Sequence, residues 1–177
     1  MSERSVQFRF ATSADVDDVV SLVESAYRGE TSRAGWTTEA DLLGGQRTDR
    51  DEIADVIADA KARLLLCLRD GQLAGCVLAR LQGGEGYIGM LAVRPTEQGS
   101  GVGRQLLREA EKTLGRKFGA SSAHMTVIRQ RTELIAWYER RGYHRTGKTE
   151  PFPYGNPRFG VPNRADLEFL VLEKQIR

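Results

Sequence analysis

Residues 94–107 read RPTEQGSGVGRQLL, in which Gly99, Gly101 and Gly103 alternate immediately before a helical pattern. Glycine is disfavoured in a helix by roughly 1 kcal/mol relative to alanine, so three glycines at the start of a helix need a physical reason. A glycine loop between a strand and a helix forms an anion site, because its backbone N–H groups and the helix dipole favour negative charge. A tight turn alone would need one glycine. The loop is therefore interpreted as a site for a phosphate group.

Hydrophobic periodicity around this loop predicts a single α+β domain that covers residues 1–177. Alternating or short apolar runs predict strands at 6–10, 63–69, 72–81, 87–93, 124–128, from 142 onward and at 166–174. Helical spacing predicts helices from a cap at Thr12 or Ser13 to Tyr27, and at 51–62, 102–118 and 132–141. Hairpins early in the chain and β-α-β units later predict a mixed sheet.

Charge and hydropathy exclude several classes of partner. The chain has 26 Lys and Arg against 24 Asp and Glu, a net charge of +2, which is too even for a nucleic-acid or anionic-membrane partner. No apolar run approaches the length of a membrane span, and residues 1–10 lack the apolar core of a signal peptide. The expected location is the cytoplasm.

The two cysteines lie on either side of a predicted hairpin turn at Asp70-Gly71. That register places Cys67 opposite Ala74 and Cys76 opposite Leu65. The cysteines would then be diagonal neighbours, about 7–8 Å apart, beyond the usual reach of a disulfide. We expect reduced core thiols. The two histidines, His124 and His144, add no ligand spacing, so no metal site is expected.

Two common phosphate-binding patterns fit the loop poorly. A kinase-type P-loop closes with Gly-Lys-Ser/Thr, whereas Gly103 is followed by Arg104 and Gln105. The dinucleotide fingerprint needs a glycine where this chain has Arg104, in an early βαβ unit rather than past the middle of the chain. Neither pattern is matched in full.

A third pattern fits. QGSGVG, residues 98–103, resembles the Gln/Arg-x-x-Gly-x-Gly/Ala signature of the GNAT superfamily of acyl-CoA-dependent N-acetyltransferases. Downstream, IAWYERRGY at 135–143 resembles the Tyr-x-x-x-Gly-Phe/Tyr element of that family, with a helix and a strand between the two motifs. The resemblance extends from about residue 6 to residue 174 and is loose at 28–60 and 148–165.

The resemblance implies a fold and a coenzyme. The fold is a mixed, mostly antiparallel seven-stranded sheet flanked by about four helices, with a bulge in the central strand that opens a V-shaped slot. The coenzyme is acetyl-CoA, with its pyrophosphate on the loop amides and its pantetheine arm along the exposed edge of the central strand. The implied coenzyme-binding residues are Leu91, Ala92, Val93, Gln98, Gly99, Ser100, Gly101, Val102, Gly103 and Arg104.

The resemblance also implies direct transfer of the acetyl group to an amine, with Tyr138 as the acid that protonates the departing thiolate. Many relatives carry a glutamate on the central strand as the general base, but here that strand reads GYIGMLAV, with Tyr87 near the corresponding place. Deprotonation of the amine would need an ordered water, a carboxylate such as Glu30 or Glu39, or an amine of low pKa.

Two segments, at 28–47 and 151–164, are expected to wall the acceptor site. Alternatively their aromatic residues fill a core edge or a homodimer contact. The candidate residues are Arg28, Arg33, Trp36, Arg47, Phe152, Tyr154 and Phe159, together with Tyr87. They suit an amine that also bears a carboxylate or an aromatic portion. A protein N-terminus, an amino acid, a polyamine and a xenobiotic amine all stay open.

Two other functions stay open as well. The domain could bind acetyl-CoA as a regulatory sensor without turnover, although the intact Tyr138 argues against this. The glycine loop could instead hold a nucleotide, in which case ATP or NAD would protect the protein and coenzyme A would not.

Overall fold

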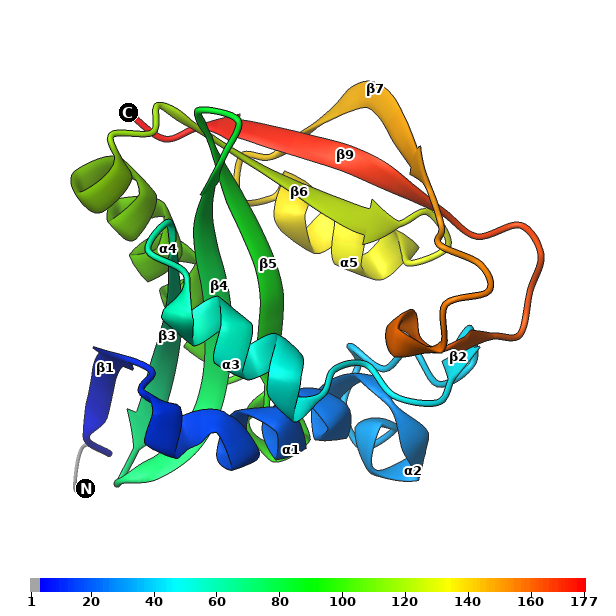
Figure 1. Ribbon diagram of the computed structural model, residues 1–177, viewed down its shortest axis with the longest axis horizontal. Coiled ribbons are helices and arrows are strands. Elements are labelled where there is room, and N and C mark those ends of the chain that lie inside the picture. Colours follow the sequence, from blue (N-terminus) through cyan, green and yellow to red (C-terminus); the bar gives the residue numbers. More distant parts are fainter. Residues whose placement is uncertain (1–3) are drawn as a thin grey trace.

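The computed structural model describes residues 4–177, except for the side chain of Phe159. A seven-stranded sheet forms its centre (Figure 1). The strands follow in the spatial order β1 (Val6–Phe10), β3 (Ala62–Arg69), β4 (Gln72–Gln82), β5 (Glu85–Val93), β6 (Ser122–Ile128), β9 (Glu168–Gln175) and β7 (His144–Pro151). All neighbours are antiparallel except β5 and β6, so the mixed, mostly antiparallel sheet is confirmed.

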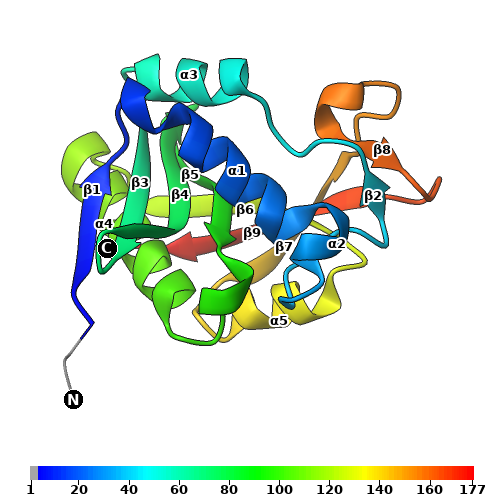
Figure 2. The same ribbon diagram turned by 90° about the horizontal axis from the view of Figure 1, so that it is seen from below.

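The helices form a layer on each face of the sheet (Figure 2). Helices α1 (Val16–Tyr27) and α3 (Arg50–Ala58) pack on one face, whereas α4 (Val102–Phe118) and α5 (Thr132–Glu139) pack on the other. The short helix α2 (Gly29–Ser32) was not predicted, nor was the small second sheet of β2 (Leu43–Gly44) and β8 (Val161–Pro162).

Helix α4 shows why this part of the chain is predictable from its pattern. Its apolar residues 102, 106, 107, 110 and 114 are all buried, because this spacing keeps them on one face of a helix. Gly119 ends the helix in the left-handed conformation, with φ of 67°. The predicted bounds, 102–118, are confirmed.

Strand β5 separates from β6 after its first few residues but stays paired with β4 to its end. It pairs with β6 only at Gly86 and Tyr87. Its register with β4 shifts between Cys76 and Leu78, and opposite this shift Met90 has a positive φ of 50°. The bulge turns the rest of β5 away from β6, so a slot opens between the two strands, as the resemblance implied.

The predicted register of the first hairpin is wrong by one residue. Cys67 lies opposite Gly75, and Cys76 lies opposite Leu66. A bulge after Cys67 leaves one residue of β4 unpaired, so the register beyond the bulge is shifted by one residue. The turn at Asp70-Gly71 is where it was predicted, and both cysteines are free and fully buried. Burial raises the pKa of the Cys67 thiol to about 11 and that of Cys76 to about 12.

Two predicted helices are too long at their C-terminal ends. Helix α3 ends at Ala58, because Asp59 is already extended and a turn at residues 60–61 then leads into β3. Helix α5 ends at Glu139 because the chain then turns through Gly142, which has a positive φ of 94°.

Within residues 4–177, no helix combines the length and the apolarity that a bilayer crossing requires. The cytoplasmic location and the homodimer contact stay predictions.

The half-exposed ion pair between Arg9 and Asp15 gives the first testable prediction. Two hydrogen bonds of 2.8 Å from Arg9, and one from the Thr12 N–H, lower the pKa of Asp15 from 3.8 to about 2. The stabilisation is therefore complete above pH 4 and is lost as the pH falls from about 4 to about 2. Because Arg9 faces solvent, we expect Asp15→Asn to lower the free energy of unfolding at pH 7 by only about 1 kcal/mol.

Urea denaturation between pH 2 and pH 7 measures this difference. Asp18→Asn, at an exposed position on α1, is the control and should change stability by less than about 0.5 kcal/mol. A difference between Asp15→Asn and the parent protein that persists at pH 2 would contradict the assignment.

Candidate active site

The glycine loop joins the end of β5 to α4. Gly99 and Gly101 have positive φ values of 81° and 90°, so both need glycine for their backbone conformation. Gly103 is helical, and a Cβ there would lie 3.5 Å from the Val93 side chain and 3.6 Å from Trp137. The turn therefore needs two glycines for its backbone conformation rather than one. A Cβ at Gly103 would make only ordinary van der Waals contacts.

The loop ends at the N-terminus of a long helix. Gly101 caps α4, and its carbonyl accepts the hydrogen bond of Gln105, at 3.1 Å. The N–H groups of the first turn before Gln105 have no carbonyl within the helix to bind. With the helix dipole, these N–H groups make the loop attractive for an anion.

A cavity of about 750 Å³ lies against this loop, between β5 and α5. Loop residues 98–101 line it, together with Gly103, Arg104, Leu91 and Val93. Val102 and Ala92 do not line it, since their side chains are buried in the two cores on opposite faces of the sheet. Of the ten predicted coenzyme residues, the structure therefore brings eight together around one cavity.

Three arginines line the same cavity, Arg104, Arg140 and Arg141. The Arg141 guanidinium lies 3.7 Å from the centre of the Trp137 ring. Burial, and then the positive charges of Arg140, Arg104 and Arg108, lower the pKa of Arg141. A bound anion would relieve this repulsion, so the cavity suits a ligand with several phosphate groups.

Along the edge of β5 that faces away from β4, side chains form the hydrogen bonds that a neighbouring strand would otherwise form. The Leu91 carbonyl accepts a hydrogen bond from the Tyr27 hydroxyl, and the Val93 carbonyl accepts one from Gln98 Nε2, at 3.0 Å. The N–H and C=O groups of a strand residue point to the same side. The Val93 N–H is therefore directed into the slot, where it could bind an extended ligand.

Gln98 fastens the segment before Glu39 to this edge. Its side chain accepts a hydrogen bond from the Trp36 N–H and donates one to Thr37 Oγ1, both at 2.8 Å. Trp36 consequently lies over the first cavity, 6.3 Å from the Trp137 ring, and lines that cavity rather than the second one described next.

A second cavity, of about 280 Å³, opens on the other side of the slot. Its lining includes four of the residues predicted for the acceptor wall, Arg28, Arg47, Tyr87 and Phe152. The remaining candidates of the acceptor wall are placed elsewhere or are not described. Arg33 lines neither cavity and pairs with Glu30 and Asp41, Tyr154 donates its hydroxyl proton to the Arg164 carbonyl, and the Phe159 side chain lies outside the described part.

Tyr138 lies where the two cavities meet. Tyr27, Leu91, Leu134 and Tyr138 line both of them. The Tyr138 ring packs edge-on against Trp137 and Tyr143, and its hydroxyl makes no hydrogen bond to another described residue. Burial raises the pKa of Tyr138 far above its ordinary value, so the phenol keeps its proton throughout the neutral range.

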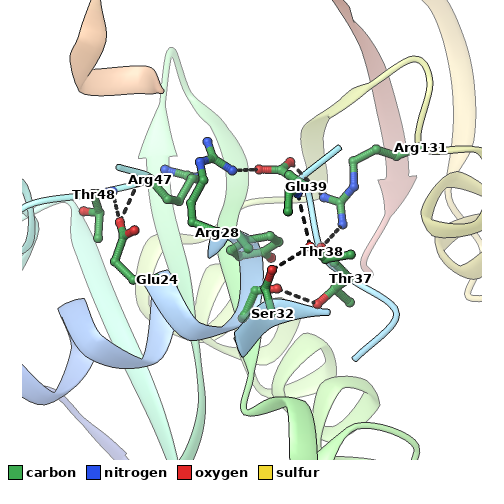
Figure 3. Close-up of polar contacts among 12 residues, drawn as sticks. Glu24, Arg28, Ser32, Thr37, Thr38, Glu39, Arg47, Thr48 and Arg131 are labelled. Carbon is green, nitrogen blue, oxygen red and sulfur yellow. Dashed lines mark hydrogen bonds and ion pairs between the residues drawn. The ribbon is translucent and has the colours of Figure 1, made fainter. Parts of the chain in front are cut away.

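Glu39 is buried between two arginines (Figure 3). Its oxygens accept hydrogen bonds from Arg28, at 2.5 Å, and from Arg131, at 3.0 Å. Burial alone would raise the pKa of Glu39, but Arg131 and Arg28 bring it below its ordinary value. A carboxylate held in this way is a poor proton acceptor. The other candidate, Glu30, has a side chain that is 91% exposed and lines neither cavity.

Sequence reasoning missed Arg131. It precedes α5, bonds Glu39 and the Thr37 carbonyl, and lies 5.4 Å from the centre of the Tyr27 ring. The sequence around Arg131 did not indicate a site residue, because its partner Glu39 lies 92 residues away in the chain.

A glycine loop at a helix N-terminus and a central strand that separates from its parallel neighbour are the two features that the resemblance to the GNAT superfamily implied. The model of the acetyltransferase (GNAT) family matches residues 22–143, and the chain belongs to this family. Its similarity to the IAA acetyltransferase of Azospirillum brasilense is 31% identity over 102 residues. That match covers 56% of this chain and 64% of the other protein, so the chain spans somewhat less than two thirds of that relative.

Solved structures share the fold at low identity. The ribosomal-protein-S18-alanine N-acetyltransferase from Escherichia coli is 14% identical, with a TM-score of 0.71 over 97% of this chain and 94% of that one. The yncA putative acetyltransferase from Salmonella typhimurium, solved with acetyl-CoA, is 18% identical, with a TM-score of 0.70 over 98% and 95%. The paia N-acetyltransferase from Thermoplasma acidophilum, in complex with coenzyme A, is 17% identical, with a TM-score of 0.65 over 97% and 99%.

Glu39 gives the second prediction. Glu39→Gln leaves two buried guanidinium groups without their shared carboxylate, and breaking such a buried pair costs about 3–5 kcal/mol of folding free energy. Chemical denaturation at pH 7 measures the loss. Glu30→Gln, on the same segment but exposed, should change stability by less than about 0.5 kcal/mol. Similar stability of the two variants would refute the structural role of Glu39.

Proposed function

We propose that the protein is an acetyl-CoA-dependent N-acetyltransferase that acts on a primary amine of a small molecule or peptide. The observation that carries the proposal is the position of Tyr138, whose unbonded hydroxyl lies between the arginine-rich loop cavity and the second cavity. A proton donor there can serve a thioester that enters from one side and an amine that enters from the other.

The coenzyme occupies the first cavity in this proposal. The loop amides and Arg104 bind the pyrophosphate, and Arg140 and Arg141 bind a further phosphate group of the coenzyme. The pantetheine arm lies along Leu91 and Val93, and an N–H of this edge polarises the thioester carbonyl. Relatives of the same fold with acetyl-CoA or coenzyme A bound support this choice of co-substrate.

The reaction joins the amine nitrogen to the acetyl carbonyl carbon. A neutral amine attacks, a tetrahedral intermediate forms, and the carbon–sulfur bond breaks with its electron pair on sulfur. Tyr138 donates its proton to the sulfur and regains one from solvent, while the nitrogen loses a proton to water. The products are the acetylated amine and coenzyme A.

Among the described residues, two carboxylates line the second cavity, those of Glu39 and Glu52. Both oxygens of Glu39 bind arginines, and one oxygen of Glu52 accepts the Thr48 hydroxyl, at 2.6 Å. We assign the role of general base to an ordered water, which takes the amine proton. Three guanidinium groups around the cavity disfavour an ammonium ion there, so the neutral form of the amine is favoured.

The third prediction concerns the ligand of the glycine loop. Acetyl-CoA or coenzyme A at about 100 times its dissociation constant should stabilise the protein by about 2.7 kcal/mol, a rise in Tm of about 5–10 °C. A thermal-shift titration with acetyl-CoA, coenzyme A, ATP and NAD measures this. A response to ATP or NAD alone would favour a nucleotide-binding protein.

Gly101→Leu should weaken the shift with acetyl-CoA at least about tenfold in ligand concentration, since a side chain there enters the space of the phosphates. Gly71→Leu is the matched control, because its φ of 79° imposes a similar strain in an open hairpin turn. Equal acetyl-CoA affinity in the two variants would remove the loop from the site.

Tyr138→Phe gives the fourth prediction. Loss of the proton donor should lower kcat by about 10²–10⁴-fold, with little change in the KM for acetyl-CoA. The release of coenzyme A with a confirmed acceptor, followed from pH 7 to pH 9, measures the effect. Tyr143→Phe removes a neighbouring hydroxyl that bonds Glu111 and lines neither cavity, so it should keep its kcat. A Tyr138→Phe rate equal to that of the parent across this range would exclude the acid role.

A sensor without turnover would behave differently. It would respond to acetyl-CoA in the thermal-shift titration but release no coenzyme A with any amine.

A further inference from the structure

The second cavity carries a charge that its own residues do not balance. Its charged lining consists of the guanidinium groups of Arg28, Arg47 and Arg131 and the carboxylates of Glu39 and Glu52. Three positive charges against two negative ones leave one positive charge without a counterion. A net charge in a small, partly buried space favours a ligand of the opposite sign.

Of the three guanidinium groups in this lining, that of Arg47 is the one that no carboxylate of the described residues contacts directly. Arg28 and Arg131 both bind Glu39, and the Glu52 carboxylate accepts the Thr48 hydroxyl. Within the part of the chain that the structure describes, Arg47 forms no ion pair with a carboxylate. Its guanidinium carbon lies 5.9 Å from the centre of the Tyr27 ring.

The position of Arg47 is fixed by its backbone. The N–H groups of Arg47 and Thr48 donate to one oxygen of Glu24 on α1, at 2.6 and 2.9 Å (Figure 3). The side chain thus starts from a rigid point at the edge of the cavity. Burial works against the charge of Arg47, but Glu39 and Glu52 favour it, and its pKa lies above the ordinary value.

Arg47 and Tyr138 mark two different sides of this cavity. Tyr138 lines the second cavity and the coenzyme cavity, whereas Arg47 lines the second cavity and a third one, of about 320 Å³, that extends past Arg80 and Arg158. A ligand that spans the second cavity can therefore place one end near Tyr138 and the other near Arg47. Apolar side chains, including Met90, Phe152 and Phe169, line the space as well.

We infer that the acceptor is a small amine that also bears a carboxylate, and that Arg47 binds this carboxylate while the amine faces Tyr138. This inference rests on the proposed function, since it names the substrate of the same site. A volume of about 280 Å³ can hold an acceptor the size of an amino acid. The positive surplus disfavours polyamines.

The test compares L-methionine, L-leucine and L-phenylalanine with their carboxamides, and includes spermidine. Acid and amide differ only in the group that Arg47 would bind. The amide also carries the less basic amine. Near neutral pH, where the assay is run, the amide therefore has the larger fraction of neutral amine, which works against a preference for the acid. Coenzyme A release should give a kcat/KM that is about 10- to 100-fold higher for at least one acid than for its amide, the usual range for a charge-assisted hydrogen bond.

Arg47→Gln should bring that ratio close to 1, mainly through the KM of the acid, with the affinity for acetyl-CoA unchanged. Arg47→Lys, which keeps the charge, should retain part of the preference. Arg50→Gln is the matched control, since Arg50 is exposed, pairs with Asp17 and lines none of the three cavities. Its ratio should equal that of the parent protein.

The same ligands are also tested by equilibrium binding to the protein loaded with coenzyme A, which needs no turnover. If the protein binds the acids selectively and Arg47→Gln abolishes this selectivity, the inference is supported even when no acceptor is acetylated. A lack of acetylation would contradict only the proposed function. Equal binding of acids and amides, binding of neither, or an acid preference that survives in Arg47→Gln overturns the inference.

Discussion

The separation of β5 from β6 is the constraint on which the rest of the structure depends. Two parallel pairs at Gly86 and Tyr87 hold the strands together, and the bulge at Met90 then turns β5 away. A non-glycine residue with a positive φ is strained and persists only where its surroundings enforce it. Here the hydrogen bond from Tyr27 to the Leu91 carbonyl occupies the backbone group that a strand would otherwise bind. The two cavities lie along this separated part of β5, and Leu91 lines both of them.

Side chains from distant segments connect the walls of the two cavities beside the separated strand β5. Gln98 ties the segment at 36–37 to the end of β5, and Glu39 joins that segment to Arg131 at the start of α5. Because α5 carries Tyr138, the buried carboxylate positions the walls of both cavities relative to one another. Its cost in desolvation is offset by two guanidinium partners, which explains why Glu39 is ionised and structural.

The sequence was most informative where a local pattern decides the outcome. The stripe of α4, the turn at Asp70-Gly71 and the glycine loop follow from periodicity and backbone conformation, and all three are where they were predicted. The register of the cysteines was wrong because a bulge depends on packing across strands rather than on local pattern. Trp36 was expected at the acceptor wall but lines the first cavity, and Arg131 was not predicted as a site residue. The positions of both depend on partners far away in the chain.

The burial of the two cysteines has a practical consequence for enzymology. Thiol reagents attack the thiolate, and both Cys67 and Cys76 are 0% exposed, with pKa values of about 11 and 12. A chromogenic disulfide reagent added to the folded protein would therefore react with the thiol of released coenzyme A and not with the two cysteines. In a variant that has lost its fold, the two sulfhydryls would react without any acetyl donor. A blank without donor then doubles as a check of structural integrity in every kinetic run.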